Sequence, residues 1–153
     1  MQYIFYFEIK MELDNKDLKI INALREDSRE SIKKIARKTN IRPSTVHQRI
    51  QRLIKNNIID KFTIKLNNKA IGENFIAFLL VKGTTSEYIT QKFLASKNVR
   101  EVFGVTGEYD VLVKLKFKDV DEFNDFIIKF RKENKGIQAT LSMVATANIK
   151  EEF

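Results

Sequence analysis

The sequence contains no cysteine, no tryptophan, one histidine, one proline and five glycines among its 153 residues. The absence of cysteine excludes disulfides, thiolate metal sites and cysteine nucleophiles, and a single histidine would leave a zinc site dependent on carboxylates. So few glycines and prolines exclude a glycine-rich phosphate loop and a low-complexity linker. This composition excludes enzymes that rely on cysteine or on a cluster of histidines. We expect no metal, no cofactor and no catalytic residue.

Long apolar runs are also missing, because no stretch reaches the roughly 18 residues of a membrane span. Residues 1–10 are apolar and aromatic, but they lack the basic start and the small-residue cleavage site of a signal peptide. We interpret them as an N-terminal extension that forms a short strand; Met11, directly before the first helix signal, offers an alternative start of the chain. The composition, 43% hydrophobic and 31% charged, is that of a chain able to bury a core. We expect a cytoplasmic protein without a membrane segment.

The positive charge is concentrated in one part of the chain. The formal net charge is +8, and residues 11–66 hold 14 basic and 7 acidic side chains, whereas residues 67–153 hold 13 and 12. A basic module beside a nearly neutral one indicates that the first binds a polyanion and the second has another task. A generally basic protein without such a partner is the alternative on charge alone.

Helix signals dominate the basic part. Asp14 stands where an N-cap is expected, with Asp17 three residues later in the first turn, and the apolar periodicity continues to about Glu26. A second, shorter helix is predicted over 31–38. Asn40 then occupies a position that favours a left-handed residue, and the only proline, Pro43, is placed to begin a third helix that runs to about residue 56.

This third helix is predicted to bind DNA. Its apolar stripe is centred on Ile50, and no acidic residue occurs between Ile32 and Ile59. The other side carries hydroxyls, amides and cations, which are the groups that contact phosphates and base edges. Two short helices, a tight turn and this helix predict a winged-helix-like helix-turn-helix domain over 11–60, with an ordinary basic three-helix bundle as the alternative. The predicted DNA-binding residues are Arg42, Ser44, Thr45, His47, Gln48, Arg49, Gln51, Arg52 and Lys55.

The pattern changes after this domain. Residues 61–66 alternate and predict a strand within a hinge over 61–73, with Asn67 and Asn68 in a turn. A third part, 74–153, follows with the order βαββαβ, which predicts a four-stranded antiparallel ferredoxin-like sheet in an α+β protein. The expected elements are strands over 75–81, 99–106, 109–117 and 138–149, and helices over 86–96 and 120–132.

One face of this sheet is expected to have no helix on it. Apolar side chains alternate along the last strand, and an uncovered apolar sheet face predicts pairing with a second copy of the chain. Pairing also suits a helix-turn-helix, because two recognition helices then reach successive major grooves. The alternating residues are Ala139, Leu141, Met143, Ala145 and Ala147.

The order and spacing of several short motifs resemble the Lrp/AsnC, or feast/famine, family of transcription regulators over residues 11–150. The resemblance implies a DNA-binding domain joined to a domain that binds amino acids or related small molecules, and dimers that assemble into tetramers, octamers or larger rings. This sequence departs from the family pattern at Asn40, where glycine is usual, at Arg42, where serine is usual, and at Ser142. The motifs are Leu13-Asp14-x-x-Asp17-x-x-Ile20-Ile21, Ile35-Ala36, Ser44-Thr45-Val46-His47-x-Arg49-Ile50-x-x-Leu53, Ile58-Ile59, Gly72 and Val105-Thr106-Gly107-Glu108-Tyr109-Asp110.

The resemblance also implies an effector pocket between dimers. Amides near Gly107 can donate to a carboxylate, and Asp110 can receive an ammonium group. Without the resemblance a plain hairpin turn is the better interpretation of these four residues. Thr140 and Ser142 match positions where the family often has two threonines, and their hydroxyls share a strand face. The implied effector-binding residues are Gly107, Glu108, Tyr109, Asp110, Thr140 and Ser142.

Three other functions are alternatives to an effector-responsive DNA-binding regulator. An orphan regulator or architectural protein without an effector is the first alternative. An enzyme is supported by fold analogy alone, and the single histidine, His47, lies on the predicted DNA helix. RNA binding through the sheet is disfavoured, because the uncovered face is aliphatic rather than studded with aromatic residues.

Overall fold

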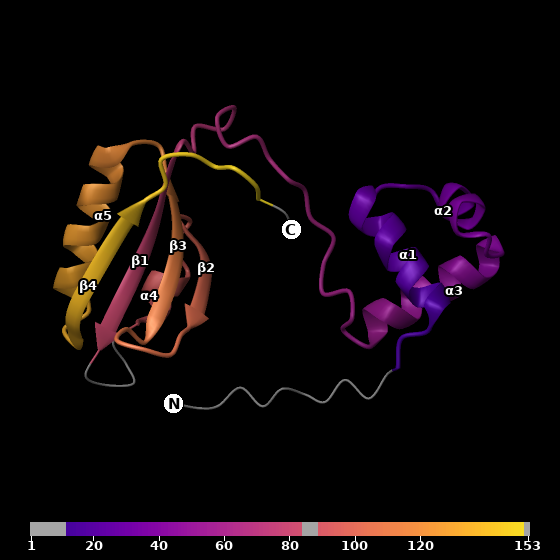
Figure 1. Cartoon of the computed structure of the whole chain (residues 1–153), viewed down its shortest axis with the longest axis horizontal. Coiled ribbons are helices and arrows are strands. Elements are labelled where there is room, and N and C mark those ends of the chain that lie inside the picture. Colours follow the sequence, from indigo (N-terminus) through magenta and orange to yellow (C-terminus); the bar gives the residue numbers. More distant parts are fainter. Residues whose placement is uncertain (1–11, 84–88, 152–153) are drawn as a thin grey trace. The chain divides into compact units, whose positions relative to one another are not determined.

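The computed structural model describes residues 12–83 and 89–151, so the strand expected over 1–10 lies outside the described residues. The chain forms two compact units that divide between Ile64 and Lys65. The first unit is helical, and the second is a sheet with helices (Figure 1). Each unit is described by itself.

The first unit contains α1 (Asn15–Glu26), α2 (Ile32–Thr39) and α3 (Pro43–Lys55). Asp14 caps α1 as predicted, since its carboxylate accepts hydrogen bonds from the amides of Lys16 and Asp17 at 2.8 and 2.9 Å. The Asp17 carboxylate accepts in return from the Asp14 amide at 3.2 Å. This reciprocal capping box satisfies amides that the helix leaves without partners.

The turn between α2 and α3 has the predicted geometry. Asn40 adopts a left-handed conformation with φ of 56°, and Pro43 begins α3. Arg42 occupies the N-cap position and makes no side-chain capping bond. The first amides of α3 therefore receive no capping side chain from that residue.

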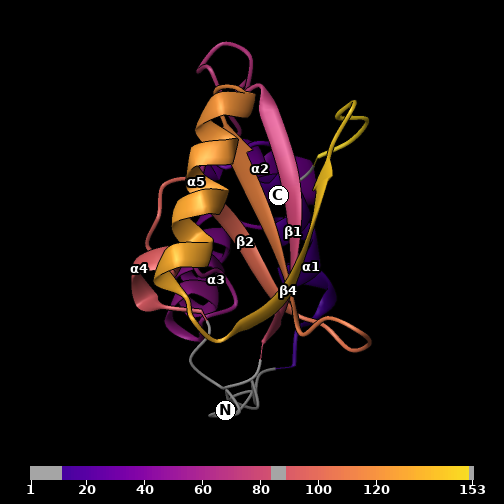
Figure 2. The same cartoon turned by 90° about the vertical axis from the view of Figure 1, so that its left-hand side faces the viewer.

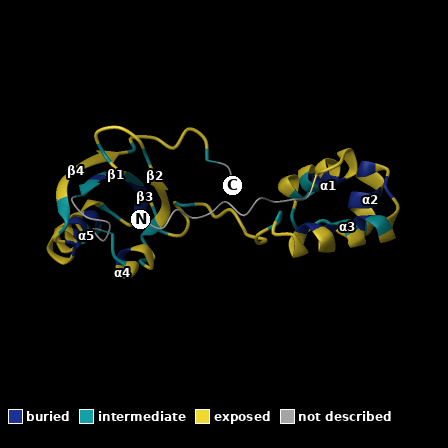
Figure 3. Cartoon of the chain, turned by 90° about the horizontal axis from the view of Figure 1, so that it is seen from below, coloured by how far each residue is buried: buried dark blue, intermediate teal, exposed yellow. Residues whose placement is uncertain are grey.

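The three helices bury a common apolar core. In Figure 3 each of them carries buried segments beside exposed ones. Val46, Ile50 and Leu53 of α3 are buried, as an apolar stripe centred on Ile50 predicts, whereas the neighbouring Ile54 is 37% exposed. The core residues are Ile20, Ala23, Ile35, Ala36, Ile41, Val46, Ile50 and Leu53.

The prediction of a strand over 61–66 is wrong. Residues 60–67 have no regular secondary structure, and Phe62, Ile64 and Leu66 are exposed. Alternation makes a strand only where a neighbouring strand supplies backbone hydrogen bonds, and no such ladder to this segment occurs within the described residues. The expected turn follows, over 68–72, and ends at Gly72 with φ of 75°.

The second unit is the predicted ferredoxin-like arrangement. The antiparallel sheet has the order β2-β3-β1-β4, and α4 and α5 lie on one face of it (Figure 2). Its elements are β1 (Phe75–Gly83), α4 (Gln91–Leu94), β2 (Val99–Gly104), β3 (Val111–Phe117), α5 (Val120–Glu133) and β4 (Ile137–Val144).

Several predicted boundaries are too generous. The helix expected over 86–96 is described only as α4, which begins where the Thr90 hydroxyl accepts from the Phe93 amide at 3.3 Å, and residues 84–88 lie outside the described part. The last strand ends at Val144 instead of residue 149. Ala145 and Ala147 therefore lie beyond the strand on which they were expected.

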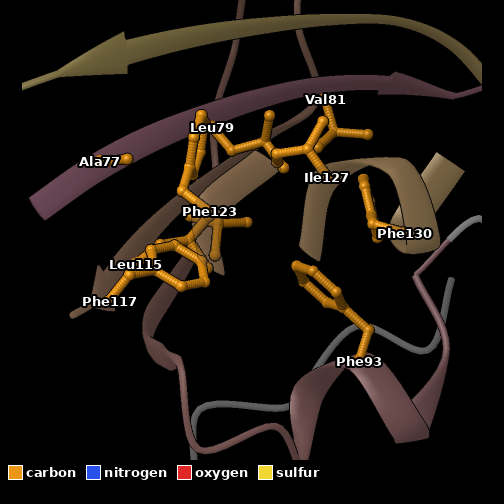
Figure 4. Packing of buried hydrophobic residues seen from close by; sticks show 10 residues of the cluster. Ala77, Leu79, Val81, Phe93, Leu115, Phe117, Phe123, Ile127 and Phe130 are labelled. Atoms are coloured by element: carbon orange, nitrogen blue, oxygen red, sulfur yellow. The ribbon is translucent and has the colours of Figure 1, made fainter. Parts of the chain in front are cut away.

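Aromatic side chains fill the space between the sheet and its helices. Phe93 of α4 and Phe130 of α5 have ring centroids 4.4 Å apart, and both face Leu79 and Val81 of β1 (Figure 4). Burial of each large side chain contributes about 1.5–3 kcal/mol. This core keeps the sheet and helices in one unit, and none of the helices in the described part of the chain covers the opposite sheet face.

Candidate nucleic-acid interface and effector site

The predicted DNA-binding residues lie on the outward side of α3. The structure brings them onto one surface because the opposite stripe of the helix enters the core. Thr45 and Arg49 are half-buried. The exposed members are Arg42, Ser44, His47, Gln48, Gln51, Arg52 and Lys55.

Two arginines of this surface have partners within the unit. Arg49 Nη1 lies 2.6 Å from Asp14 Oδ1 and 2.9 Å from Asp17 Oδ1, and Arg52 Nη2 lies 2.6 Å from Asp17 Oδ2. The Arg49 side chain is 19% exposed and that of Arg52 is 45% exposed. The pairs connect the start of α1 to α3, so these arginines hold the helix in position and Arg52 keeps part of its guanidinium toward solvent.

The pairing shifts the pKa of both partners in the direction that favours their charged forms. The hydrogen bond from Arg49, with the amide of Asp17, lowers the pKa of Asp14 to about 2. The bond to Asp14 raises the pKa of Arg49. No local sequence pattern predicts this contact, because Asp14 and Arg49 are 35 positions apart.

A second basic surface, on α2, was missed by the site prediction. Lys33, Lys34, Arg37 and Lys38 are all exposed on this helix. Lys34 Nζ lies 3.0 Å from Oε1 of Glu30, whose side chain is nearly buried. In a helix-turn-helix the helix before the recognition helix crosses the DNA backbone. The absence of acidic residues over 32–59 could have predicted this second basic surface from the sequence.

The predicted effector turn lies between β2 and β3. Gly107 has φ of 132°, a conformation that strongly favours glycine, and its α-carbon faces open space. Asp110 is exposed, but its Oδ2 accepts a hydrogen bond from the Gly83 amide at 2.9 Å. One carboxylate oxygen of Asp110 thus holds the end of β1. Glu108 is exposed and Tyr109 is half-buried.

Thr140 and Ser142 lie on β4, on the sheet face that α5 covers. They pair with Val81 and Leu79, whose side chains enter the core. The Thr140 hydroxyl accepts from Nε and Nη2 of Arg131 at 3.2 and 2.6 Å. The two residues share a face as predicted.

β1 separates this pair from the effector turn. Val81 pairs with Val111 on one side and with Thr140 on the other, so Asp110 and Thr140 are at the same end of the sheet. An open hollow of about 370 Å³ adjoins Thr140 and is lined by Arg131, Ile137, Gln138 and Ala139. Within one chain the turn and the threonine are therefore near each other without forming one enclosed pocket.

Residues 12–83 and 89–151 contain no group of three or more histidine, cysteine or acidic side chains arranged to hold a metal. None of the helices described is long and apolar enough to cross a membrane.

Comparison with known proteins agrees with both units. Residues 13–54 match the AsnC-type helix-turn-helix domain, and residues 76–153 match the Lrp/AsnC ligand binding domain. The fold and the matched domains define a transcriptional regulator, not an enzyme, with a DNA-binding domain and a ligand-binding domain. The chain belongs to the Lrp/AsnC family.

Individual relatives cover almost the whole chain. An uncharacterized helix-turn-helix transcriptional regulator of Pyrococcus furiosus is 37% identical over 146 residues, 92% of this chain and 97% of the relative. A transcriptional regulator of Neisseria meningitidis, solved in complex with L-Met, has a TM-score of 0.86 at 23% identity. The match covers 92% of this chain and 94% of that protein. E. coli AsnC has a TM-score of 0.84 at 22% identity, and the match covers 94% of this chain and 98% of AsnC. These two structures support the fold.

Proposed function

We propose that the chain is a sequence-specific DNA-binding regulator whose DNA affinity or assembly responds to an amino acid or a related small molecule. The exposed side of α3 carries this proposal. It combines amides, hydroxyls and cations without a carboxylate, on a helix that begins with a tight turn. A regulator of this kind acts where the DNA is, which keeps the cytoplasm as the expected location.

The residues on α3 divide by the contact that their chemistry favours. Gln48 and Gln51 are three positions apart on the exposed face, and an amide can bond to two atoms of an adenine edge. Lys55 and the exposed part of Arg52 are suited to phosphates. Arg42, at the uncapped start of α3, adds positive charge where helix amides attract an anion.

Selection from a random pool of duplexes tests the DNA proposal. The full chain should enrich one sequence and bind it about 10³-fold or more tightly than a scrambled duplex of the same length. Lys55→Ala should lower the slope of log affinity against log salt by about one, because one phosphate contact is lost. Equal affinity for every duplex would reduce the proposal to an architectural protein.

The effector proposal rests on the chemistry at one end of the sheet. An amino acid offers a carboxylate and an ammonium group. Amides around Gly107 and the hydroxyls of Thr140 and Ser142 suit the carboxylate, and Asp110 suits the ammonium. The Neisseria meningitidis relative was solved with L-Met, which supports an amino acid as the first ligand class to test. An orphan regulator without an effector is the alternative.

We extend the proposal to a homodimer formed through the sheet face without helices, with tetramers or octamers built from such dimers. Phe78 and Leu80 of β1 pair with Met143 and Leu141 of β4 on that face, and Leu141 and Met143 are more than two-fifths exposed. Exposed apolar side chains in a contiguous group favour association. Sedimentation equilibrium should show a dimer at micromolar concentration, and a folded monomer would exclude it.

A further inference from the structure

The sheet face without helices is not uniformly apolar, because β3 carries two lysines on it. Lys114 pairs with Phe78 and Lys116 pairs with Ile76 in the register of β1 and β3. Their side chains are only 16% and 7% exposed. Nearly buried ammonium groups on an association surface carry a large desolvation cost unless a carboxylate neutralises them.

The carboxylate comes from the end of the described chain. Glu151 Oε1 lies 2.5 Å from Lys114 Nζ and 3.0 Å from Lys116 Nζ, and the Glu151 side chain is 10% exposed. Asn68 joins the group, since its Oδ1 accepts from Lys116 Nζ at 3.1 Å and its Nδ2 donates to Glu151 Oε2 at 3.3 Å. Lys65 donates to the Glu151 carbonyl oxygen.

Glu151 reaches these lysines across β1. The segment after β4 starts at the sheet edge, where the Ala145 amide donates to the Ile76 carbonyl at 2.9 Å, and ends over β3 two strands away. Ile76 is buried although it shares a face with the half-buried Phe78. The segment over 145–151 thus closes one end of the face and leaves the apolar end open.

The ammonium groups of Lys114 and Lys116 are matched by two carboxylates. Lys114 Nζ also lies 2.9 Å from Glu101 Oε1, so these two lysines face Glu101 and Glu151, while Lys65 contacts the Glu151 backbone carbonyl. A chain of net charge +8 repels its own copies, and a surface without excess charge lowers this repulsion where two copies meet. Lowering of the Glu151 pKa to about 2, chiefly by the hydrogen bond from Lys114, keeps this carboxylate charged at neutral pH.

We propose that Glu151 acts as a latch for self-association, by which we mean two roles. It neutralises Lys114 and Lys116, and it holds the C-terminal segment over the polar end of the sheet face. The apolar end of that face can then pair with a second copy. This inference rests on the proposed homodimer and names the residue on which it depends. In a two-fold interface each copy presents the same patch, so loss of Glu151 would leave uncompensated positive charge on both copies.

Sedimentation equilibrium of the full chain tests the latch. Glu151→Gln keeps the size of the side chain and removes its charge, and it should raise the dimer dissociation constant about tenfold or more. Glu133→Gln is the matched control, because Glu133 pairs with Lys92 on the helix side of the unit. It should leave the dissociation constant unchanged.

A double variant separates charge from folding. Lys116→Met with Glu151→Gln removes one cation together with the carboxylate, while Lys114 keeps Glu101 as its partner. It should restore association to within about threefold of the wild type. Circular dichroism melting of each variant shows whether it is folded.

Three results would overturn the inference. A dimer of Glu151→Gln as tight as the wild type means that the latch is not needed. A double variant that stays as weak as Glu151→Gln means that charge is not the cause. A wild-type chain that remains a monomer removes the proposed homodimer itself, which distinguishes failure of that proposal from failure of the latch alone.

Discussion

Arg52 Nη2 lies 2.6 Å from Oδ2 of Asp17, a carboxylate that solvent does not reach. The same carboxylate accepts from the Asp14 amide in the capping box of α1 and lies 2.9 Å from Arg49. One buried acid therefore takes part in the start of the first helix and pairs with two arginines of the third. The core around Ile50 determines which side of α3 faces outward, and the contact with Asp17 ties that helix to the start of α1.

Removal of that carboxylate should destabilise the helical unit. Asp17→Ala leaves Arg52 without its partner, removes one of the two acidic partners of Arg49 and takes the acceptor from the Asp14 amide. We expect a loss of about 2–4 kcal/mol, below the value for a fully buried pair because Arg52 is partly solvated. Chemical denaturation followed by circular dichroism measures it. Glu12→Ala, an exposed acid nearby, is the control. A loss under about 0.5 kcal/mol would show that the pairs contribute little.

The Asp14 carboxylate predicts an acid-sensitive contribution to stability. Its pKa falls from an ordinary 3.8 to about 2, first through the hydrogen bond from Arg49. A depressed pKa means that the charged form stabilises the fold above about pH 3.8 and that this contribution is lost as the pH falls toward 2. Carboxyl carbon NMR should follow the titration, and Arg49→Gln should return the pKa toward 3.8. An Asp14 that titrates near 3.8 in the wild type contradicts the pairing.

Asp110 should be required for the amino-acid response. Asp110→Asn keeps an oxygen that can accept from the Gly83 amide and removes the charge that an ammonium group needs, so the fold should persist. Calorimetry with the twenty amino acids identifies the ligand, and the variant should bind it at least about tenfold more weakly. Asp125→Asn, an exposed carboxylate of α5, should bind normally. No heat and no thermal shift with any amino acid, while DNA still binds, favours the orphan regulator.

Local signals predicted the elements of both units well. The Asp14 capping box, the left-handed Asn40 and the start of α3 at Pro43 each follow from the chemistry of one or two adjacent residues. The βαββαβ order predicted the sheet, since short connections and antiparallel neighbours leave few arrangements. The family resemblance is confirmed by both matched domains.

Contacts between distant residues were not predictable in the same way. The pairing of Arg49 with Asp14 and of Glu151 with Lys116 depends on how elements pack, which no local pattern encodes. The strand expected over 61–66 failed for a related reason, because alternation reports side-chain spacing and not the presence of a neighbouring strand. The DNA-binding and effector residues remain predictions.

The most direct measurement concerns the exposed side of α3. With the selected duplex and its scrambled counterpart, Gln48→Ala and Gln51→Ala should each reduce the free-energy difference between specific and non-specific binding by about 1–3 kcal/mol, which lowers the ratio of the two affinities, because a base contact is lost while the phosphate contacts remain. Gln91→Ala, an exposed amide at the start of α4, should leave the ratio unchanged. If both α3 variants keep the wild-type ratio while melting normally, α3 does not read DNA and the central claim is contradicted.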